Sequence, residues 1–227
     1  MSDVIHLNLG FTNVYLLKSD SGYVQFDTGY KHNMKKYLKL LEKNQILPEE
    51  IKLIIINHAH FDHTGALKET KELTKAQVLV HENEKEFVAK GISAEVRPHT
   101  FLTKLLIPTM PKSWARTDPV EPDIVIIDNY SLEDFGIKAK VIHTPGHTPG
   151  TISVITEDGD AIVGCNLHGP PLRLRRGFPA IYYDEESIWK SWERIIEEGA
   201  KNIYISHGKP FKVDLMKKKL AKRKKAK

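Results

Sequence analysis

Short β-like runs and helix-like spacings follow one another along the chain. Two apolar and aromatic runs at 13–17 and 22–26 flank the turn Ser19-Asp20-Ser21-Gly22, which predicts a β-hairpin. Apolar residues then recur every three or four positions over about 33–44, as in an amphipathic helix. The run 51–57 is almost continuously apolar and β-branched, which is typical of a strand buried on both faces.

The later part of the chain repeats this alternation. We expect helices at 64–74, 83–90 and 184–198, and strands at 77–81, 123–128, 138–143, 151–156, 160–165 and 202–206. Asp158-Gly159 is a strong hairpin signal between two of these strands. Helices and strands alternate in two similar halves, which predicts an α/β (α+β) protein with a two-sheet core covered by outer helices.

Residues 92–122 do not follow the alternation. Five prolines interrupt this segment, and its apolar residues show no clear period. Long segments of this kind often form lids or binding loops. A packed surface excursion is an equally good interpretation, so both remain open at this stage.

Charge changes the picture only at the end of the chain. The 227 residues are 41% apolar and 28% charged, which is a globular balance. The net charge is +5, but eight positive charges lie in the last twelve residues and the remainder carries −3. We therefore expect a single folded domain over 1–210 and a basic tail over 211–227, and no general nucleic-acid-binding surface.

Features that would direct the chain to a membrane are not visible in the sequence. No apolar run approaches the roughly 18 residues of a transmembrane helix. The first residues lack the basic region and apolar stretch of a signal peptide. Cys165 is the only cysteine, so no internal disulfide can form. These features predict a cytoplasmic protein without membrane contact, and they say nothing about its oligomeric state.

Histidines and an aspartate gather directly after the strand predicted at 51–57. Four potential metal ligands lie within six residues there: His58, His60, Asp62 and His63. The first two are two positions apart, so they lie on one side of an extended chain. The last two come where the chain turns into a helix. Imidazole and carboxylate groups bind zinc, iron or manganese, so the spacing predicts a metal site.

Three further candidate ligands lie at the ends of later strands: His147, Cys165 and His207. The first is in the Pro/Gly-rich turn 143–150, and the other two directly follow or end apolar runs. A site supported by a sheet is built at such strand ends. Each residue alone would be interpreted as structural, but together with the earlier cluster they are candidate ligands.

The order of these residues resembles the metallo-β-lactamase superfamily, from about residue 5 to residue 210. The HxHxDH motif of that family matches His58, His60, Asp62 and His63, and its two later metal histidines match His147 and His207. The resemblance implies an αββα sandwich with the metals at one edge of the paired sheets. It is specific for fold and metal binding, and not for the substrate.

The resemblance also implies a ligand set for two zinc ions. One metal would take His58, His60 and His147, and the other Asp62 and His207 with Cys165 and His63. Most hydrolases of the family carry a bridging Asp at the position of Cys165. A thiolate favours zinc over manganese or magnesium. If Cys165 is only a buried apolar residue, a single metal is the alternative. Whether both Cys165 and His63 are ligands is left open.

By this resemblance, the chain hydrolyses a small carbonyl substrate (a lactone, thioester, ester or β-lactam) through attack of a metal-bound hydroxide. Asp62 would orient the water and accept a proton. Asp27 is either an acceptor that supports the ligand loop or a turn-former before Gly29. Two alternatives are a nuclease or phosphodiesterase of the same fold, and iron-dependent oxygen or persulfide chemistry.

Substrate contacts are expected in the Gly/Pro-rich loop after Cys165. His168, Arg173 and Tyr183 are the candidates there. An arginine could bind a carboxylate or phosphate, and a tyrosine could donate a hydrogen bond to a developing oxyanion. The alternative is that the arginine is solvated and the tyrosine is packed under the next helix.

Overall fold

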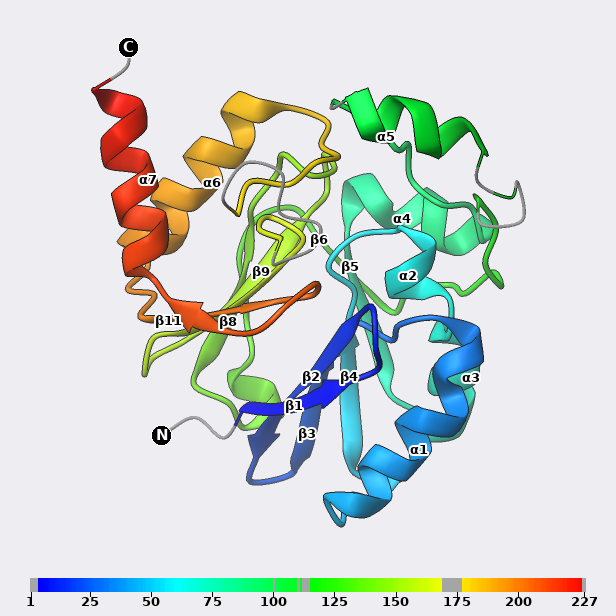
Figure 1. Cartoon of the computed structure of the whole chain (residues 1–227). Helices are drawn as coiled ribbons and strands as arrows, with labels where there is room; N and C mark the ends of the chain where they lie inside the picture. Colours follow the sequence, from blue (N-terminus) through cyan, green and yellow to red (C-terminus); the bar gives the residue numbers. More distant parts are fainter. Residues whose placement is uncertain (1–3, 100, 110, 112–114, 169–176, 226–227) are drawn as a thin grey trace.

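The computed structural model describes residues 4–99, 101–109, 111, 115–168 and 177–225. Two six-stranded sheets lie face to face within this part of the chain (Figure 1). The first sheet has the order β1 (Val4–Asn8), β2 (Asn13–Ser19), β3 (Gly22–Phe26), β4 (Ile51–Ile55), β5 (Gln77–His81) and β6 (Ile124–Ile126). The second has the order β12 (Phe211–Lys212), β11 (Asn202–Ile205), β10 (Asp160–Gly164), β9 (Ile152–Thr156), β8 (Ala139–His143) and β7 (Tyr130–Ser131).

Helices cover the outer faces of both sheets (Figure 1). Beside the first sheet lie α1 (Met34–Lys43), α3 (Leu67–Thr74) and α4 (Glu82–Lys90). The short helix α2 (Phe61–Thr64) follows β4 at the edge where the strands end, and α5 (Phe101–Leu106) lies above α4 in the view. Beside the second lie α6 (Glu185–Glu197) and α7 (Asp214–Lys224). Short 3-10 turns occur at Lys31–Asn33, Pro48–Glu50, Ile107–Thr109 and Glu133–Phe135. The predicted two-sheet α/β sandwich is therefore confirmed.

Strand directions bring several strand ends to one edge of the molecule. β3, β4, β5 and β6 are mutually parallel, so their carboxyl ends share an edge of the first sheet. In the second sheet, β8 and β10 are both antiparallel to β9, and β11 is parallel to β10. The segments that leave β4, β8, β10 and β11 thus begin at the carboxyl ends where the predicted ligands stand.

Alternating side chains on β2 show how the core is layered. Val14 and Leu16 are buried in the apolar cluster between the first sheet and its helices. Tyr15 and Leu17 belong to the cluster between the two sheets. A third cluster, which includes Trp192, joins the second sheet to α6 and α7. The period of two along a strand is what allows one sheet to pack on both faces.

The helix predicted over 64–74 forms as α3 from Leu67 to Thr74, and the separate short helix α2 ends at Thr64. The carbonyl oxygen of His63 accepts hydrogen bonds from the Thr28 amide (3.0 Å) and the Thr28 hydroxyl (2.7 Å). The Ala66 amide donates to the carbonyl of Gly29 (3.1 Å). These bonds hold the ligand segment against the end of β3, and the regular helix begins only at Leu67.

Residues after 210 form part of the fold, whereas the sequence predicted a basic tail over 211–227. β12 pairs with β11, and α7 packs against α6 with Met216 and Leu220 buried. These two apolar residues are four positions apart, so they share one helix face although the helix is rich in lysine. Arg223 also pairs with Glu186 on α6. The described residues outside the expected boundary therefore continue the domain.

The proline-rich segment 92–122 packs along a later loop. Isolated bridges join Ile92 to Arg116 and Pro98 to Ile181. The imidazole of His99 stacks on Tyr182, with ring centroids 3.7 Å apart. The segment thus contacts the loop before α6, which is compatible with both interpretations of its role. Among the described helices, none is long and apolar enough to cross a membrane.

Candidate metal centre

The structure brings all seven predicted ligands to one edge of the two sheets. Each follows a strand end: four after β4, and one each after β8, β10 and β11. All seven side chains are buried: His58, His60, Asp62, His63, His147, Cys165 and His207. The residues come from both halves of the chain, so the centre exists only where the two sheets meet.

Three of these residues form what we call the three-histidine cluster: His58, His60 and His147. The Nε2 atom of His58 lies 2.8 Å from Nδ1 of His60, and Nε2 of His147 lies 3.2 Å from the same Nδ1. Three ring nitrogens thus converge. Two nitrogens can share only one proton, so hydrogen bonds among the three cannot satisfy them all, whereas a cation would.

The other four form what we call the mixed cluster: Asp62, His63, Cys165 and His207. Oδ2 of Asp62 lies 3.1 Å from Nε2 of His207 and 3.5 Å from Nε2 of His63. The sulfur of Cys165 lies 3.2 Å from Nε2 of His63. The side-chain nitrogen, oxygen and sulfur atoms of this cluster are the donor set that zinc prefers.

Cys165 stands between the two clusters. Its sulfur lies within 4.8 Å of ligand nitrogens of His58 and His147, and also within 4.8 Å of those of His63 and His207. One side chain can therefore face both clusters. The thiol is buried and unpaired with another cysteine, as expected from the single cysteine of the chain.

Outer hydrogen bonds orient four of the imidazoles. Nδ1 of His58 donates to Asn57 Oδ1 (2.7 Å), and Nδ1 of His147 donates to the Ile181 carbonyl (2.8 Å). Nδ1 of His63 donates to Asp27 Oδ2 (2.7 Å), and Nδ1 of His207 donates to the Phe11 carbonyl (2.9 Å). When the outer nitrogen donates, the neutral ring presents a lone pair on its inner nitrogen. The arrangement therefore fits a metal ion.

Charge separates the two clusters. Burial lowers the pKa of His58 well below its usual value and that of His147 to about 3, so these rings stay neutral. Burial alone would also lower the pKa of His207, but the charges of Cys165 and Asp62 raise it to about 10. The charge of Asp27 likewise raises the pKa of His63 against the effect of burial.

The pKa values of the acidic groups in the mixed cluster are lowered, whereas those of its histidines are raised. Burial alone would raise the pKa values of Asp62 and Cys165. The positive charges of His63 and His207 more than offset this effect and hold both pKa values well below their ordinary ranges. The mixed cluster is thus a set of charged groups that stabilise one another, and the thiol is held as the thiolate that binds metals.

Asp27 supports the mixed cluster from beneath. Its Oδ2 accepts from His63 Nδ1 and from the Ser206 hydroxyl (3.2 Å), while Oδ1 accepts from the Asn57 amide (2.9 Å). Asp27 has a positive φ of 65°, a left-handed conformation that Asp tolerates better than most residues. The residue therefore turns the chain and also holds the ligand loop.

Glu84 is a supporting residue that the sequence analysis missed. This buried side chain on α4 accepts a hydrogen bond from the Ala59 amide at Oε2 (2.8 Å). Its Oε1 accepts from the Thr148 hydroxyl (2.7 Å) and the Gly150 amide (3.0 Å). A Cβ at Gly150 would lie 2.6 Å from Glu84 Cγ, so glycine makes room for the carboxylate. Glu84 thereby ties the loop of His58 and His60 to the loop of His147.

Asn57 forms a second link between the halves. Its Oδ1 accepts from the Cys165 amide (3.2 Å) as well as from His58, and its Nδ2 donates to the Ile152 carbonyl (2.5 Å). Gly164 has a φ of +57°, and a Cβ there would lie 2.2 Å from the Asn57 carboxamide. The glycine before Cys165 is required by this close approach.

The predicted substrate contacts have different surroundings. His168 is buried, with its ring centroid 5.2 Å from that of His207 and 5.7 Å from that of His147. Neither ring nitrogen of His168 makes a hydrogen bond of normal geometry within the described chain, although its interaction with Cys165 helps to lower the pKa of that thiol. Tyr183 is exposed, and the Arg97 guanidinium lies 3.8 Å from its ring centroid. Arg173 falls outside the described residues.

Two curated proteins are similar to this chain in sequence. The probable metallo-hydrolase YqgX of Bacillus subtilis is 31% identical over 152 residues, which are 66% of this chain and 63% of YqgX. The human acyl-coenzyme A thioesterase MBLAC2 is 27% identical over 158 residues, which are 64% of this chain and 54% of that protein. This chain thus spans less than two thirds of the length of either relative.

A solved structure shares the fold. The metallo-β-lactamase family protein TTHA1429 of Thermus thermophilus superposes with a TM-score of 0.71 and 22% identity, covering 97% of this chain and 79% of that one. The family model described as the metallo-β-lactamase superfamily matches residues 7–207. With its sandwich fold and histidine-rich centre, the chain belongs to the metallo-β-lactamase superfamily.

Proposed function

We propose that this chain is a zinc-dependent hydrolase of a small acyl substrate, with thioesters and esters preferred over lactones and β-lactams. Family membership supports metal-dependent hydrolysis in general. The observation that carries the proposal is the convergence of seven candidate ligand side chains, with four imidazoles held by outer hydrogen bonds so that their other ring nitrogens face the centre. A thioester is favoured because the name of one relative is that of an acyl-coenzyme A thioesterase.

Zinc suits the donor set. The ligands proposed for one ion are His58, His60 and His147, and those for a second are Asp62, His63, Cys165 and His207. A thiolate is a soft donor, and tetrahedral sites with thiolate and imidazole ligands are typical of zinc. A bound zinc ion would supply Lewis acidity and lower the pKa of water towards neutrality.

The chain's own groups would do the remaining work. Asp62 is held ionised by His63 and His207, so its carboxylate is available to orient a water by accepting its hydrogen bond. Hydrolysis would convert the thioester and water into a carboxylic acid and a thiol, with one proton passing to the leaving sulfur. His168, whose buried ring lies near those of His147 and His207, would contact the substrate or leaving group.

Metal analysis and a substrate screen test the proposal. We expect about two zinc ions per chain after purification without added metal, and turnover of acyl thioesters that stops when the metal is chelated. Failure of the zinc-loaded protein to hydrolyse thioesters, esters, lactones or β-lactams would reject the proposed function. Iron in place of zinc would favour oxygen or persulfide chemistry. The cytoplasmic location stays a prediction from the sequence.

A further inference from the structure

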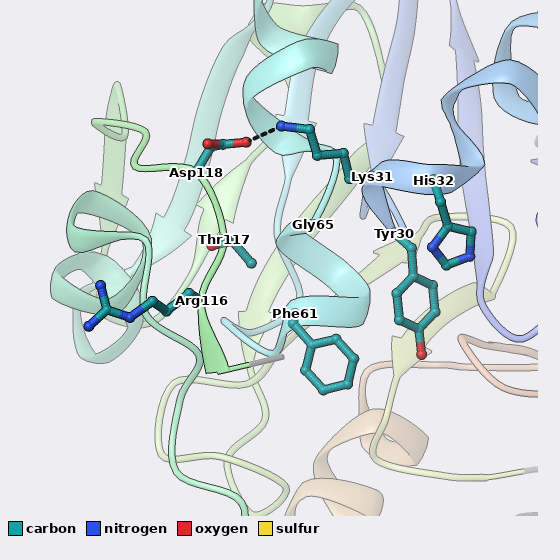
Figure 2. Close-up of a pocket in the computed structure, with 8 residues that line it drawn as sticks. All are labelled: Tyr30, Lys31, His32, Phe61, Gly65, Arg116, Thr117 and Asp118. Carbon is teal, nitrogen blue, oxygen red and sulfur yellow. Dashed lines mark hydrogen bonds and ion pairs between the residues drawn. The ribbon is translucent and has the colours of Figure 1, made fainter. Parts of the chain in front are cut away.

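A pocket lies beside the candidate metal centre, between the end of β3 and the proline-rich segment. Its volume is about 510 Å³, within the range of roughly 300–1,000 Å³ found for small-molecule sites. Figure 2 shows the residues that line it: Tyr30, Lys31, His32, Phe61, Gly65, Arg116, Thr117 and Asp118. Nothing in the proposed ligand set occupies this space.

One end of the pocket is charged, and its charges are paired. The Lys31 ammonium lies 2.6 Å from Asp118 Oδ2 and 2.6 Å from Glu69 Oε1. Two carboxylates thus more than balance the charge of this lysine. In Figure 2 the Arg116 guanidinium extends away from the rings of Tyr30 and Phe61. The charged end therefore offers no free cation aimed at the aromatic part of the pocket.

The other end is aromatic. The rings of Tyr30 and Phe61 pack edge to face, with centroids 5.6 Å apart, and the imidazole of His32 stacks on Tyr30 at 5.0 Å. In Figure 2 the rings of Tyr30 and Phe61 project in the same direction, away from the Lys31–Asp118 ion pair. Stacked and edge-to-face rings form a wall suited to apolar or aromatic groups.

The aromatic end is the one that adjoins the metal ligands. Phe61 stands between His60 and Asp62 in the sequence. The ring of Phe11, which is 52% exposed, lies 4.7 Å from that of His207 and 6.3 Å from that of Tyr30. Burial raises the pKa of Tyr30, and the negative charge of Asp62 raises it further.

We propose that this pocket receives the acyl part of the substrate and that it selects aromatic or branched apolar acyl groups. The proposal rests on the proposed function. An acyl chain attached to a carbonyl at the mixed cluster would extend along Phe61 and Tyr30, towards Thr117 on the opposite wall. Burying apolar carbon against these rings would favour a phenylacetyl group over an acetyl group.

Kinetics on a series of thioesters with one thiol test this selectivity. For acetyl, hexanoyl and phenylacetyl thioesters, we expect kcat/KM to rise with the apolar acyl group by about tenfold or more, the scale of one extra buried methylene or larger group. Tyr30→Ala and Phe61→Ala should each lower the phenylacetyl-to-acetyl ratio by about tenfold. Thr117→Phe should fill the pocket and favour the acetyl substrate. Equal kcat/KM values across the series would overturn the proposal.

Two variants control the interpretation. Leu47 is an exposed apolar residue before β4, at the opposite end of that strand from the ligands, and Leu47→Ala should leave the ratio unchanged. Tyr30→Phe keeps the ring and removes the hydroxyl, so it should retain the ratio that Tyr30→Ala loses. The metal content of each variant shows whether a substitution such as Phe61→Ala has disturbed the neighbouring candidate ligands. If Phe61→Ala keeps its full metal content and its phenylacetyl-to-acetyl ratio is unchanged, the proposal is contradicted.

Direct binding separates this proposal from the proposed function. Phenylacetone carries the same benzyl group as the phenylacetyl substrate but has no bond to hydrolyse. We expect saturation-transfer NMR on the purified protein to show binding of phenylacetone that Tyr30→Ala abolishes, even if no thioester is hydrolysed. Absence of binding to the wild-type protein, or equal binding to Tyr30→Ala, would reject the pocket.

Discussion

The three-histidine cluster and the mixed cluster lie side by side, yet they are built in opposite ways. The first consists of imidazoles that burial keeps neutral. The second contains carboxylate, thiolate and imidazolium groups that stabilise one another's charges. The difference teaches that a site of neutral ligands is ready for a cation, whereas a site of paired charges must first give up its protons.

The acceptors that hold the outer imidazole nitrogens also differ in charge between the two clusters. The outer nitrogens of His58 and His147 donate to uncharged oxygens, those of Asn57 and the Ile181 backbone. The outer nitrogen of His63 donates to the carboxylate of Asp27. A charged acceptor raises the basicity of its imidazole, so the mixed cluster holds both protons and metals more strongly through this contact.

The most severe test removes one ligand from each cluster. We expect His60→Ala and Asp62→Ala each to reduce hydrolysis to the uncatalysed background, since each removes a ligand that no neighbouring side chain can replace. Steady-state turnover with metal in excess measures the effect. Circular dichroism should show an intact fold. Substantial turnover by either folded variant would be incompatible with the centre described above.

Cys165 decides whether the two clusters share a ligand. Cys165→Ser should lower the metal content from about two ions per chain to about one, because a serine hydroxyl stays protonated at neutral pH. Cys165→Asp supplies a carboxylate at the same point and should restore the second ion. Elemental analysis of the purified proteins measures both. Unchanged metal content in Cys165→Ser would show that the thiol is only a buried apolar group.

Supporting carboxylates allow each cluster to be weakened separately. Asp27→Asn should lower metal affinity at the mixed cluster by about 10–100-fold, the usual effect of losing such a partner. Glu84→Gln places an amide N–H against backbone donors, so it should weaken the three-histidine cluster, which Glu84 holds together. Competition with a chelator measures the two affinities. If both variants lower the affinity for the same ion, the assignment of Asp27 to one cluster and Glu84 to the other is wrong.

The pH dependence of metal affinity should also distinguish the two clusters, with a smaller effect than the substitutions. In the metal-free protein the pKa of His207 is about 10 and that of His63 is also raised, so both rings hold protons at neutral pH. Metal must displace these protons, so affinity at the mixed cluster should rise with pH, by up to about tenfold per pH unit for each proton.

The three-histidine cluster provides the internal reference for that titration. Its imidazoles are already neutral, with the pKa of His147 at about 3, so its affinity should be nearly constant between pH 6 and pH 9. Calorimetric titration of the metal-free protein at several pH values measures both slopes. Equal slopes at the two ions would contradict the assignment of charge to the clusters.

A functional residue can be predicted from the sequence when the residues that it works with lie close to it in the chain. The histidine motif after β4 is visible because four candidate ligands lie within six residues of chain. Asp27 is ambiguous because a turn-former and a supporting acceptor are the same residue type at the same place. Glu84 carries no signal, since it is one acidic residue among several charged residues on α4 and its partners lie up to 66 positions away.

The fold shows the same limit. The two-sheet sandwich follows from local periodicity, which fixes most strands and the helices α1, α4 and α6. The composition of the chain beyond residue 210 predicts a basic tail because lysine dominates it, while the apolar signal of α7 consists of the two buried residues Met216 and Leu220. The pocket could not be predicted, because Tyr30 and Thr117 are brought together only by tertiary packing.

Each cluster draws ligands from both halves of the chain, which has a mechanical consequence. A metal bound to His60 and His147 would act as a staple that closes a loop of almost ninety residues in the unfolded chain. The ion would then raise the free-energy barrier to separating the two sheets, in addition to its part in the reaction. Chelation should therefore accelerate unfolding and lower the melting temperature of the whole domain, and the rate of metal release would limit its lifetime in denaturant.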